Sequence, residues 1–213
     1  MKKSGLMTKR VFLDFDGTLI DSSRRLYDLF RELAPESAFS YEDYWRIKRN
    51  AVSQRDLLRE YLHYTDEQIL SFKQKWKEAV EAPERLETDA PFEGVSAFLQ
   101  DLAQRRTLYL VTARQDPDRA KAQVQKWGWE QYFTNIFVTQ QSQSKAAFVR
   151  AHLSTCDTDF FVGDTGDDIL AGKELGMKTV GVSSGFLNAD VLKKYNPDLI
   201  LDRVVELDES YSL

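Results

Sequence analysis

The sequence contains very few of the residues that build disulfides and zinc sites. Its 213 residues include one cysteine, Cys156, and two histidines, His63 and His152. A single cysteine excludes an internal disulfide, which is compatible with a reducing compartment. Both histidines lie in amphipathic helical patterns, so we expect them to be structural or solvent-facing. The sequence therefore argues against a His/Cys zinc site and against a Cys–His catalytic pair.

Long apolar runs and a strong charge of one sign are also missing. No stretch approaches the roughly 18 apolar residues of a membrane-spanning helix. The apolar run after the basic N-terminus is interrupted at Asp14 and Asp16, so we expect no signal peptide. The net charge of −5 gives no reason to expect a nucleic acid or an acidic membrane as a partner. We expect a cytoplasmic protein, whose oligomeric state the sequence leaves open.

The sequence does contain short apolar runs that alternate with helix-length amphipathic segments. The runs predict buried strands at 10–15, 107–112, 135–139, 159–163, 178–182 and 198–201. The amphipathic segments predict helices near 94–105, 117–127, 144–153, 167–175 and 187–195. Such alternation predicts an α/β fold, a Rossmann-like parallel sheet with helices on both faces.

The interval between the first two predicted strands breaks this alternation. Its patterns are helical, with helix-start signals at Ser40, Ser53 and Thr65. The interval is too long for a plain loop. We expect a four-helix insert that forms a small all-helical cap domain over 21–88, which leaves a sheet domain of 1–20 and 89–213. The insert is rich in aromatic residues and arginines, which usually form a core and a solvated face; these include Tyr44, Trp45, Arg46, Arg49 and Arg55.

Two acidic residues follow the first predicted strand. In extended chain, residues two apart project to the same side, so the carboxylates of Asp14 and Asp16 would face one pocket. In an open parallel sheet, the ligand crevice lies outside the carboxyl ends of the strands, where this pair falls. Gly17 permits a tight turn that brings backbone N–H groups toward an anion. The simpler alternative is a capped strand end beside an Asp-Gly turn.

A second acidic group follows the strand predicted at 159–163. Asp164 would stand at the strand end, while Asp167 and Asp168 would open the next helix. Helix capping alone would also explain Asp167 and Asp168, because negative charge is favourable at a helix N-terminus. If three or four of these carboxylates converge on one crevice, they need a hard cation, and Mg²⁺ suits such oxygen ligands.

Two weaker signals would complete a phosphate site. Thr112 ends a predicted strand, and its hydroxyl together with the following backbone amide, that of Ala113, could bind phosphate oxygens. Lys145 begins a predicted helix and would balance the negative charge of carboxylates and substrate. Taken singly, a strand-end threonine and a surface lysine would be equally ordinary interpretations.

Taken in order, these four signals resemble the haloacid dehalogenase-like hydrolase superfamily. The first motif stands here as DFDGTLIDS, the second as Thr112, the third as Lys145, and the fourth as GDTGDD at 163–168. The run GDTGDDILAGKELGM and the later GVSSGF are similar to the phosphoglycolate-phosphatase-like and β-phosphoglucomutase-like branch. That branch also carries a helical cap between the first and second motifs.

The resemblance implies a Mg²⁺-dependent phosphatase that hydrolyses a small phosphorylated metabolite through an aspartyl-phosphate. It assigns Asp14 as the nucleophile and Asp16 as the general acid and base. Mg²⁺ would be held by Asp14, the backbone carbonyl of Asp16, Asp164 and Asp168. The phosphate would be bound by Thr112, Ala113 and Lys145.

The sequence departs from the family pattern in two places. Lys145 is followed by Ala-Ala, where many relatives have a proline, and Arg114 stands where a small polar residue is common. Arg114 would either touch the substrate or pair at the surface. The acid at Asp16 argues against a dehalogenase. A phosphomutase of the β-phosphoglucomutase kind and a non-catalytic binding protein on the same fold remain alternatives.

Overall fold

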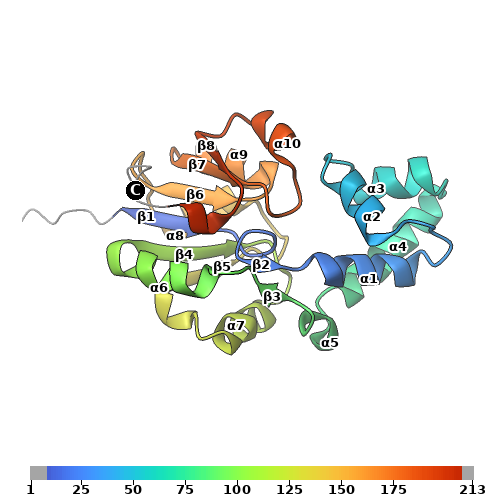
Figure 1. The fold of residues 1–213 in the computed structure, drawn as a ribbon, viewed down its shortest axis with the longest axis horizontal. Coiled ribbons are helices and arrows are strands. Elements are labelled where there is room, and N and C mark those ends of the chain that lie inside the picture. The colour runs from blue at the N-terminus through green and yellow to red at the C-terminus, as the bar shows by residue number, and fades with distance from the viewer. Residues whose placement is uncertain (1–8, 208–213) are drawn as a thin grey trace, which may run out of the picture.

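The computed structural model of the chain describes residues 9–207 and contains a six-stranded sheet with the strand order β5-β4-β1-β6-β7-β8 (Figure 1). All neighbouring strands are parallel. The strands are β1 (Arg10–Leu13), β4 (Thr107–Thr112), β5 (Phe133–Val138), β6 (Phe160–Gly163), β7 (Lys178–Val182) and β8 (Leu199–Leu201). The predicted α/β fold class is therefore confirmed; residues 1–8 and 208–213 of the predicted sheet domain lie outside the described residues.

Side chains on the two faces of the sheet pack into two separate cores. Val11 and Leu13 of β1 lie in one core, and Phe12 between them lies in the other, as the two-residue period of a strand requires. Helices α6 and α7 contribute to the first core, and α8 and α9 contribute to the second. The helices of the sheet region are α6 (Val95–Arg105), α7 (Pro117–Lys126), α8 (Lys145–His152), α9 (Gly166–Glu174) and α10 (Ala189–Lys193), with short 3₁₀ turns at Glu130–Tyr132 and Val204–Glu206.

A helical insert follows the first strands and lies to one side of the sheet (Figure 1). Its helices are α1 (Ser23–Leu33), α2 (Tyr41–Lys48), α3 (Gln54–Asp56), α4 (Asp66–Ala79) and α5 (Pro83–Leu86). A core of its own, which includes Phe30, Tyr44, Leu57 and Phe72, holds these helices together. The insert therefore lies where the sequence predicted it, although its extent as a separate domain stays a prediction.

The insert contains one more helical element than the four that the sequence predicted. Helix α3 passes directly into a π-helical segment, Leu57–Tyr61, so these two form one continuous helical stretch. Helix α5 is a fifth element that the sequence reasoning missed, because four residues are too few to show a helical period. The three predicted N-caps are present: Ser40, Ser53 and Thr65 accept hydrogen bonds from backbone amides of the following turns.

Two short strands that the sequence did not predict connect the insert to the sheet region. Strand β2 (Ile20–Asp21) pairs antiparallel with β3 (Ala90–Pro91). Two residues are too few to show the alternation by which strands are recognised. Because this pairing joins the entrance of the insert to its exit, both connections leave the sheet region at the same place.

The structure also shows where the two histidines lie. Both histidines are exposed, and His152 packs against Phe148 and Phe137 at the surface. Within residues 9–207, no helix is both long and apolar enough to cross a membrane.

Candidate active site

The candidate site lies at the carboxyl ends of the central strands. The chain adds β4 and β5 on one side of β1 and then β6, β7 and β8 on the other, so the strand order reverses at β1. Ligand crevices of open parallel sheets form at such a point. Asp14 directly follows β1, Thr112 is the last residue of β4, and Asp164 directly follows β6. The three side chains are thus brought to one edge of the sheet.

Three carboxylates converge there. Asp14, Asp164 and Asp168 are all buried, and each offers an oxygen atom within 4.8 Å of the others. Thr18 Oγ1 donates to Asp14 Oδ2 at 3.2 Å and lies 3.4 Å from Asp164 Oδ1. Clustered carboxylate oxygens are the ligands that hard divalent cations prefer, so the residues present fit an ion of the Mg²⁺ type.

Lys145 supplies the positive charge inside this cluster. It is the first residue of α8, which Ser144 caps, and its Nζ donates to Asp14 Oδ1 and, at 2.5 Å, to Asp168 Oδ1. Burial lowers the pKa of Lys145, but the two carboxylates outweigh burial and raise it above its usual range. One lysine against three carboxylates leaves an excess of negative charge.

The excess of negative charge affects the pKa values of the carboxyl groups in this cluster. Burial, together with the neighbouring acid Asp168, raises the pKa of Asp14 to about 7 despite its contact with Lys145. Burial and the charge of Asp14 likewise raise the pKa of Asp164. A buried carboxylate among other carboxylates holds its proton unless a cation joins the group, so the cluster has the electrostatic character of a cation site.

Two glycines allow the chain to approach Asp164 closely. Gly17 has φ +84°, and a Cβ atom at Gly17 or at Gly185 would overlap the Asp164 carboxylate. The backbone N–H of Phe186 donates to Asp164 Oδ2 at 2.6 Å. The segment GVSSGF, noted in the sequence, therefore closes against the acidic cluster.

Asp168 has two functions at once. Its Oδ2 accepts hydrogen bonds from Thr165 N–H at 3.1 Å and from Thr165 Oγ1 at 2.6 Å, which caps α9, while its Oδ1 accepts from Lys145. Asp168 therefore both caps α9 and lies in the carboxylate group, while its role as a metal ligand stays a prediction. Asp167 is exposed and does not join the three-carboxylate group.

The carboxylate of Asp16 is held by two arginines instead of joining the cluster. Arg25 Nη2 donates to it at 2.6 Å, and Arg114 donates from Nε at 2.7 Å and from Nη2 at 2.8 Å. The buried Asp89 accepts from the same two arginines, at 2.8 Å and 3.0 Å. Burial alone would raise the pKa of Asp16, but Arg114 and then Arg25 lower it far below its usual range.

Comparison with known proteins assigns the family. A family model described as "Haloacid dehalogenase-like hydrolase" matches residues 11–182, most of the chain. The protein belongs to this family. A curated protein of Clostridium perfringens (strain 13 / Type A), named "Putative pyrophosphatase PpaX", is 24% identical over 215 residues, covering 94% of this chain and 96% of that protein. The chain is therefore an enzyme of the haloacid dehalogenase-like hydrolases.

Solved structures agree on the fold. A haloacid dehalogenase-like family hydrolase of Streptococcus pneumoniae is 22% identical, with a TM-score of 0.77 and coverage of 96% of this chain and 98% of that chain. A structure of Haemophilus somnus 129PT, described as a "predicted phosphoglycolate phosphatase", is 19% identical, with a TM-score of 0.72 and coverage of 97% and 98%. Both share the haloacid dehalogenase-like arrangement of sheet and helical insert.

In this haloacid dehalogenase-like hydrolase, the site opens into a cavity of about 490 Å³. Its walls include the core residues that the sequence singled out, namely Asp14, Asp16, Thr112, Ala113, Lys145 and Asp164. The opposite wall is helix α4 of the insert, which contributes Lys73, Trp76 and Lys77. The cavity therefore lies between the sheet edge and the insert.

Sequence reasoning missed part of this site. Arg114 is 4% exposed and pairs with two buried acids, so the surface-pair interpretation was wrong. Arg25 and Asp89 were not singled out at all. One signal for Arg25 was available, because position 25 lies four residues before Leu29 and so shares the buried face of α1. Nothing local to Asp89 indicates its two arginine partners.

Proposed function

We propose that the protein is a Mg²⁺-dependent phosphatase that hydrolyses a small phosphate monoester through an aspartyl-phosphate on Asp14. The observation that carries the proposal is the buried group formed by Asp14, Asp164, Asp168 and Lys145 at the strand ends. This group pairs a carboxylate nucleophile with cation ligands and with a lysine that can face a phosphoryl group. Phosphoryl transfer depends on such positioning and charge balance.

In the first step, a carboxylate oxygen of Asp14 attacks the phosphorus atom, and the bond from phosphorus to the leaving oxygen breaks. Asp16 supplies the proton to that oxygen. In the second step, water attacks the phosphorus atom of the aspartyl-phosphate, Asp16 takes the proton from this water, and Asp14 is released with inorganic phosphate. Asp16 gives up one proton in the first step and regains one in the second, so all atoms and protons are accounted for over the cycle.

The two arginines bear on the timing of these proton transfers. In the present arrangement they hold Asp16 as an ionised carboxylate, which is the form that accepts a proton from water. To act as an acid, Asp16 has to lose part of this contact. Arg25 lies on α1 of the insert and also donates to the carbonyl of Val80 at 2.8 Å, so movement of the insert would change its contact with Asp16.

Mg²⁺ would be held by Asp14, Asp164, Asp168 and the backbone carbonyl of Asp16, and when bound it supplies positive charge against the phosphoryl oxygens. Thr112 Oγ1 and the backbone N–H of Ala113 would bind phosphoryl oxygens. Lys145 would neutralise their charge. The cytoplasmic location and the division into sheet and cap domains stay predictions.

Phosphate release from p-nitrophenyl phosphate tests the proposal. We expect turnover with Mg²⁺, loss of turnover after chelation with recovery on adding Mg²⁺ back, and at least about a thousandfold lower kcat for Asp14→Asn. Asp157→Asn is the matched control, because Asp157 is exposed, does not line the catalytic cavity and belongs to none of the motifs. Equal rates for Asp14→Asn and wild type would overturn the proposal.

The names of the relatives suggest a first substrate panel. Inorganic pyrophosphate and phosphoglycolate follow from the two names, and phosphorylated sugars extend the panel. Assaying phosphate release and sugar-phosphate isomerisation in the same samples separates a phosphatase from a phosphomutase.

A further inference from the structure

A second cavity adjoins the catalytic cavity. It has a volume of about 550 Å³ and lies between α2 and α4 of the insert and the core segments around α9 and Phe186. The two cavities share walls, among them Leu26, Trp76, Thr165 and Phe186. A molecule whose phosphate lies at Asp14 can therefore extend into the second cavity. A volume of this size fits an organic group much larger than a two- or three-carbon acid.

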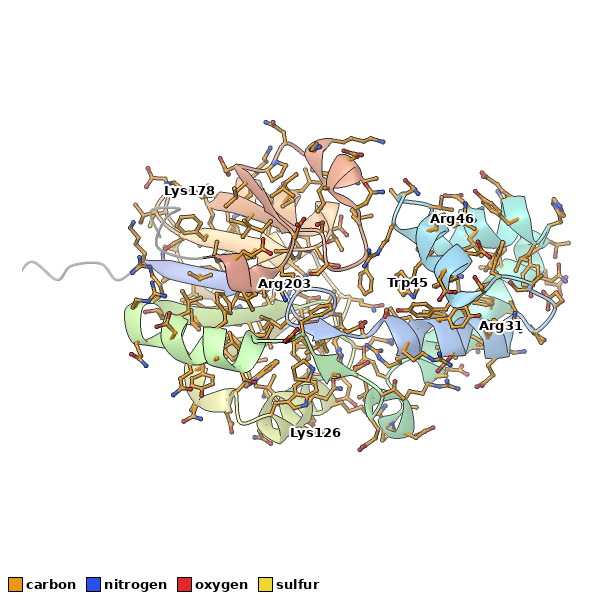
Figure 2. The ribbon with its side chains drawn as sticks, viewed as in Figure 1. Arg31, Trp45, Arg46, Lys126, Lys178 and Arg203 are labelled. Atoms are coloured by element: carbon orange, nitrogen blue, oxygen red, sulfur yellow. The ribbon has the colours of Figure 1, made fainter. Side chains whose placement is uncertain are left out.

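Several aromatic side chains line the second cavity. Tyr44, Trp45, Phe72 and Trp76 come from the insert, and Phe186 comes from the core. Trp45 stacks on Phe186, with ring centroids 5.6 Å apart and ring planes within 9°. Figure 2 shows Trp45 at the edge of the insert that faces the sheet region. Such walls favour a flat or apolar body, because they offer broad contact area and few polar partners.

Two of the residues that line this cavity carry buried N–H donors without an acceptor among the described residues. Trp45 is 7% exposed, and no described residue accepts a hydrogen bond from its buried Nε1. Buried Nε2 of Gln54 also lacks an acceptor among the described residues, and its Oε1 is already occupied by Tyr44 Oη at 3.2 Å. A buried donor without an acceptor is costly, so these atoms call for an acceptor.

Lys48 adds a positive charge to the same wall. Its Nζ donates to the carbonyl of Val52 at 2.8 Å, and none of the ion pairs found in residues 9–207 involves it. Burial lowers the pKa of Lys48 to about 8, partly offset by the charge of Asp56, so the ammonium form still predominates at neutral pH. The cavity is therefore lined by an ammonium group with one hydrogen bond and by Trp45, whose indole N–H has no acceptor among the described residues.

We propose that the second cavity is the leaving-group subsite and that it binds an organic group with a flat, apolar body ending in an oxyanion. The aromatic walls would contact the body. Lys48 and Trp45 would donate to the oxyanion, which is a carboxylate or a second phosphate group. This assignment rests on the proposed phosphatase function for its orientation, since the phosphate would occupy the Asp14 end.

Binding of uncleavable phosphonates tests the subsite without requiring turnover. para-(Carboxymethyl)benzylphosphonate and its amide, para-(carbamoylmethyl)benzylphosphonate, have the same shape and differ in the terminal charge. With Mg²⁺ and wild-type protein, calorimetry should show at least about tenfold tighter binding of the carboxylate, the size of one charge-assisted hydrogen bond. para-Xylylenebisphosphonate, measured alongside, tells a terminal phosphate-like group from a carboxylate; stronger binding of either anion than of the amide supports the proposal.

Substitutions of Lys48 and Trp45 test whether these side chains recognise the terminal anion. Lys48→Met should bring the two dissociation constants to within about twofold, whereas the matched control Lys75→Met, an exposed lysine of α4 that does not line the cavity, should keep the wild-type ratio. Trp45→Phe keeps the ring, removes the N–H and should reduce the ratio. Because each ratio is taken within one sample, partial misfolding of a variant does not alter it.

Equal affinity of wild type for the amide and for both anions would overturn the subsite. The same follows if Lys48→Met and Trp45→Phe both keep the full ratio. Failure of the phosphatase proposal is a different result, namely no phosphate release from p-nitrophenyl phosphate.

Discussion

Asp14 and Asp16 lie two residues apart at the end of one strand, and their carboxylates have opposite surroundings. Asp14 lies with Asp164 and Asp168, where one lysine faces three acids. Asp16 lies with Asp89, where two arginines face two acids. Burial acts on both carboxyl groups, yet the pKa of Asp14 is raised and that of Asp16 is lowered.

Two carboxylates of one short motif can therefore have opposite electrostatic surroundings. The Asp14 group has an excess of negative charge that a cation would relieve. The Asp16 group is balanced by protein charges alone, so its ionisation does not depend on a metal. Replacing an acid by its amide should therefore have opposite effects on the free energy of unfolding in the two groups.

The largest expected effect is on turnover. Asp16→Asn removes the proposed general acid and base and should lower kcat about 10² to 10⁴-fold. Stabilisation of the folded protein by Mg²⁺ should persist in this variant, because the Asp16 carboxylate lies outside the three-carboxylate group. Steady-state kinetics and thermal unfolding with and without Mg²⁺ measure the two properties. If Asp16→Asn lost both turnover and stabilisation by Mg²⁺, the distinction between the Asp14 group and the Asp16 group would be contradicted.

Neutralising one acid of each group should change stability in opposite directions. Asp89→Asn leaves two buried guanidinium groups facing a single carboxylate and should cost about 3–5 kcal/mol of unfolding free energy. Asp164→Asn relieves repulsion and should stabilise the metal-free protein by roughly 1–3 kcal/mol. Urea unfolding in the presence of chelator measures both. A destabilised, metal-free Asp164→Asn would contradict the charge excess assigned to its group.

Mg²⁺ itself should stabilise the wild-type protein. At a concentration one hundred times the dissociation constant, a ligand that binds only the folded state adds about 2.7 kcal/mol. Asp164→Asn should lose most of this gain, while Asp89→Asn should keep it. Thermal unfolding across a Mg²⁺ titration gives the comparison, and an equal gain in both variants would place the ion elsewhere.

The smallest expected effect is a pH dependence of Mg²⁺ binding. The pKa of Asp14 is raised to about 7 in the folded state, so below that pH a proton competes with the ion. Apparent affinity should therefore fall as the pH drops through about 7, by up to about tenfold per pH unit. Folding stability without metal has the opposite pH dependence: the contribution of Asp14 is fully present below about pH 4 and is lost as the pH rises to about 7. Affinity that is constant from about pH 8 to pH 6 would contradict the raised pKa.

The parts of this molecule that the sequence predicted are those with a local signature. Strands such as β4 and β6 appear as apolar runs, and Asp14, Thr112 and Asp164 follow or end such runs, so their convergence follows from parallel topology. The N-cap at Thr65 was equally readable, because its partner Gln68 lies three residues away.

The parts that escaped prediction depend on contacts between distant segments. Arg25, Asp89 and Arg114 come from three separate segments of the chain, and no local pattern indicates that they pair with one another. The pairing of β2 with β3 joins dipeptides on either side of the insert. Short elements and the pairing of distant charged residues have no periodic signal, so only the folded structure reveals them.

The most direct measurement of the central claim is to find the phosphoryl group on the enzyme. The protein is mixed with p-nitrophenyl phosphate and Mg²⁺, stopped with acid during turnover, digested and analysed by mass spectrometry. We expect one added phosphoryl group, located on Asp14 and missing from Asp14→Asn. Phosphate release without a phosphorylated residue, or with the phosphoryl group on a residue other than Asp14, would contradict the proposed nucleophile.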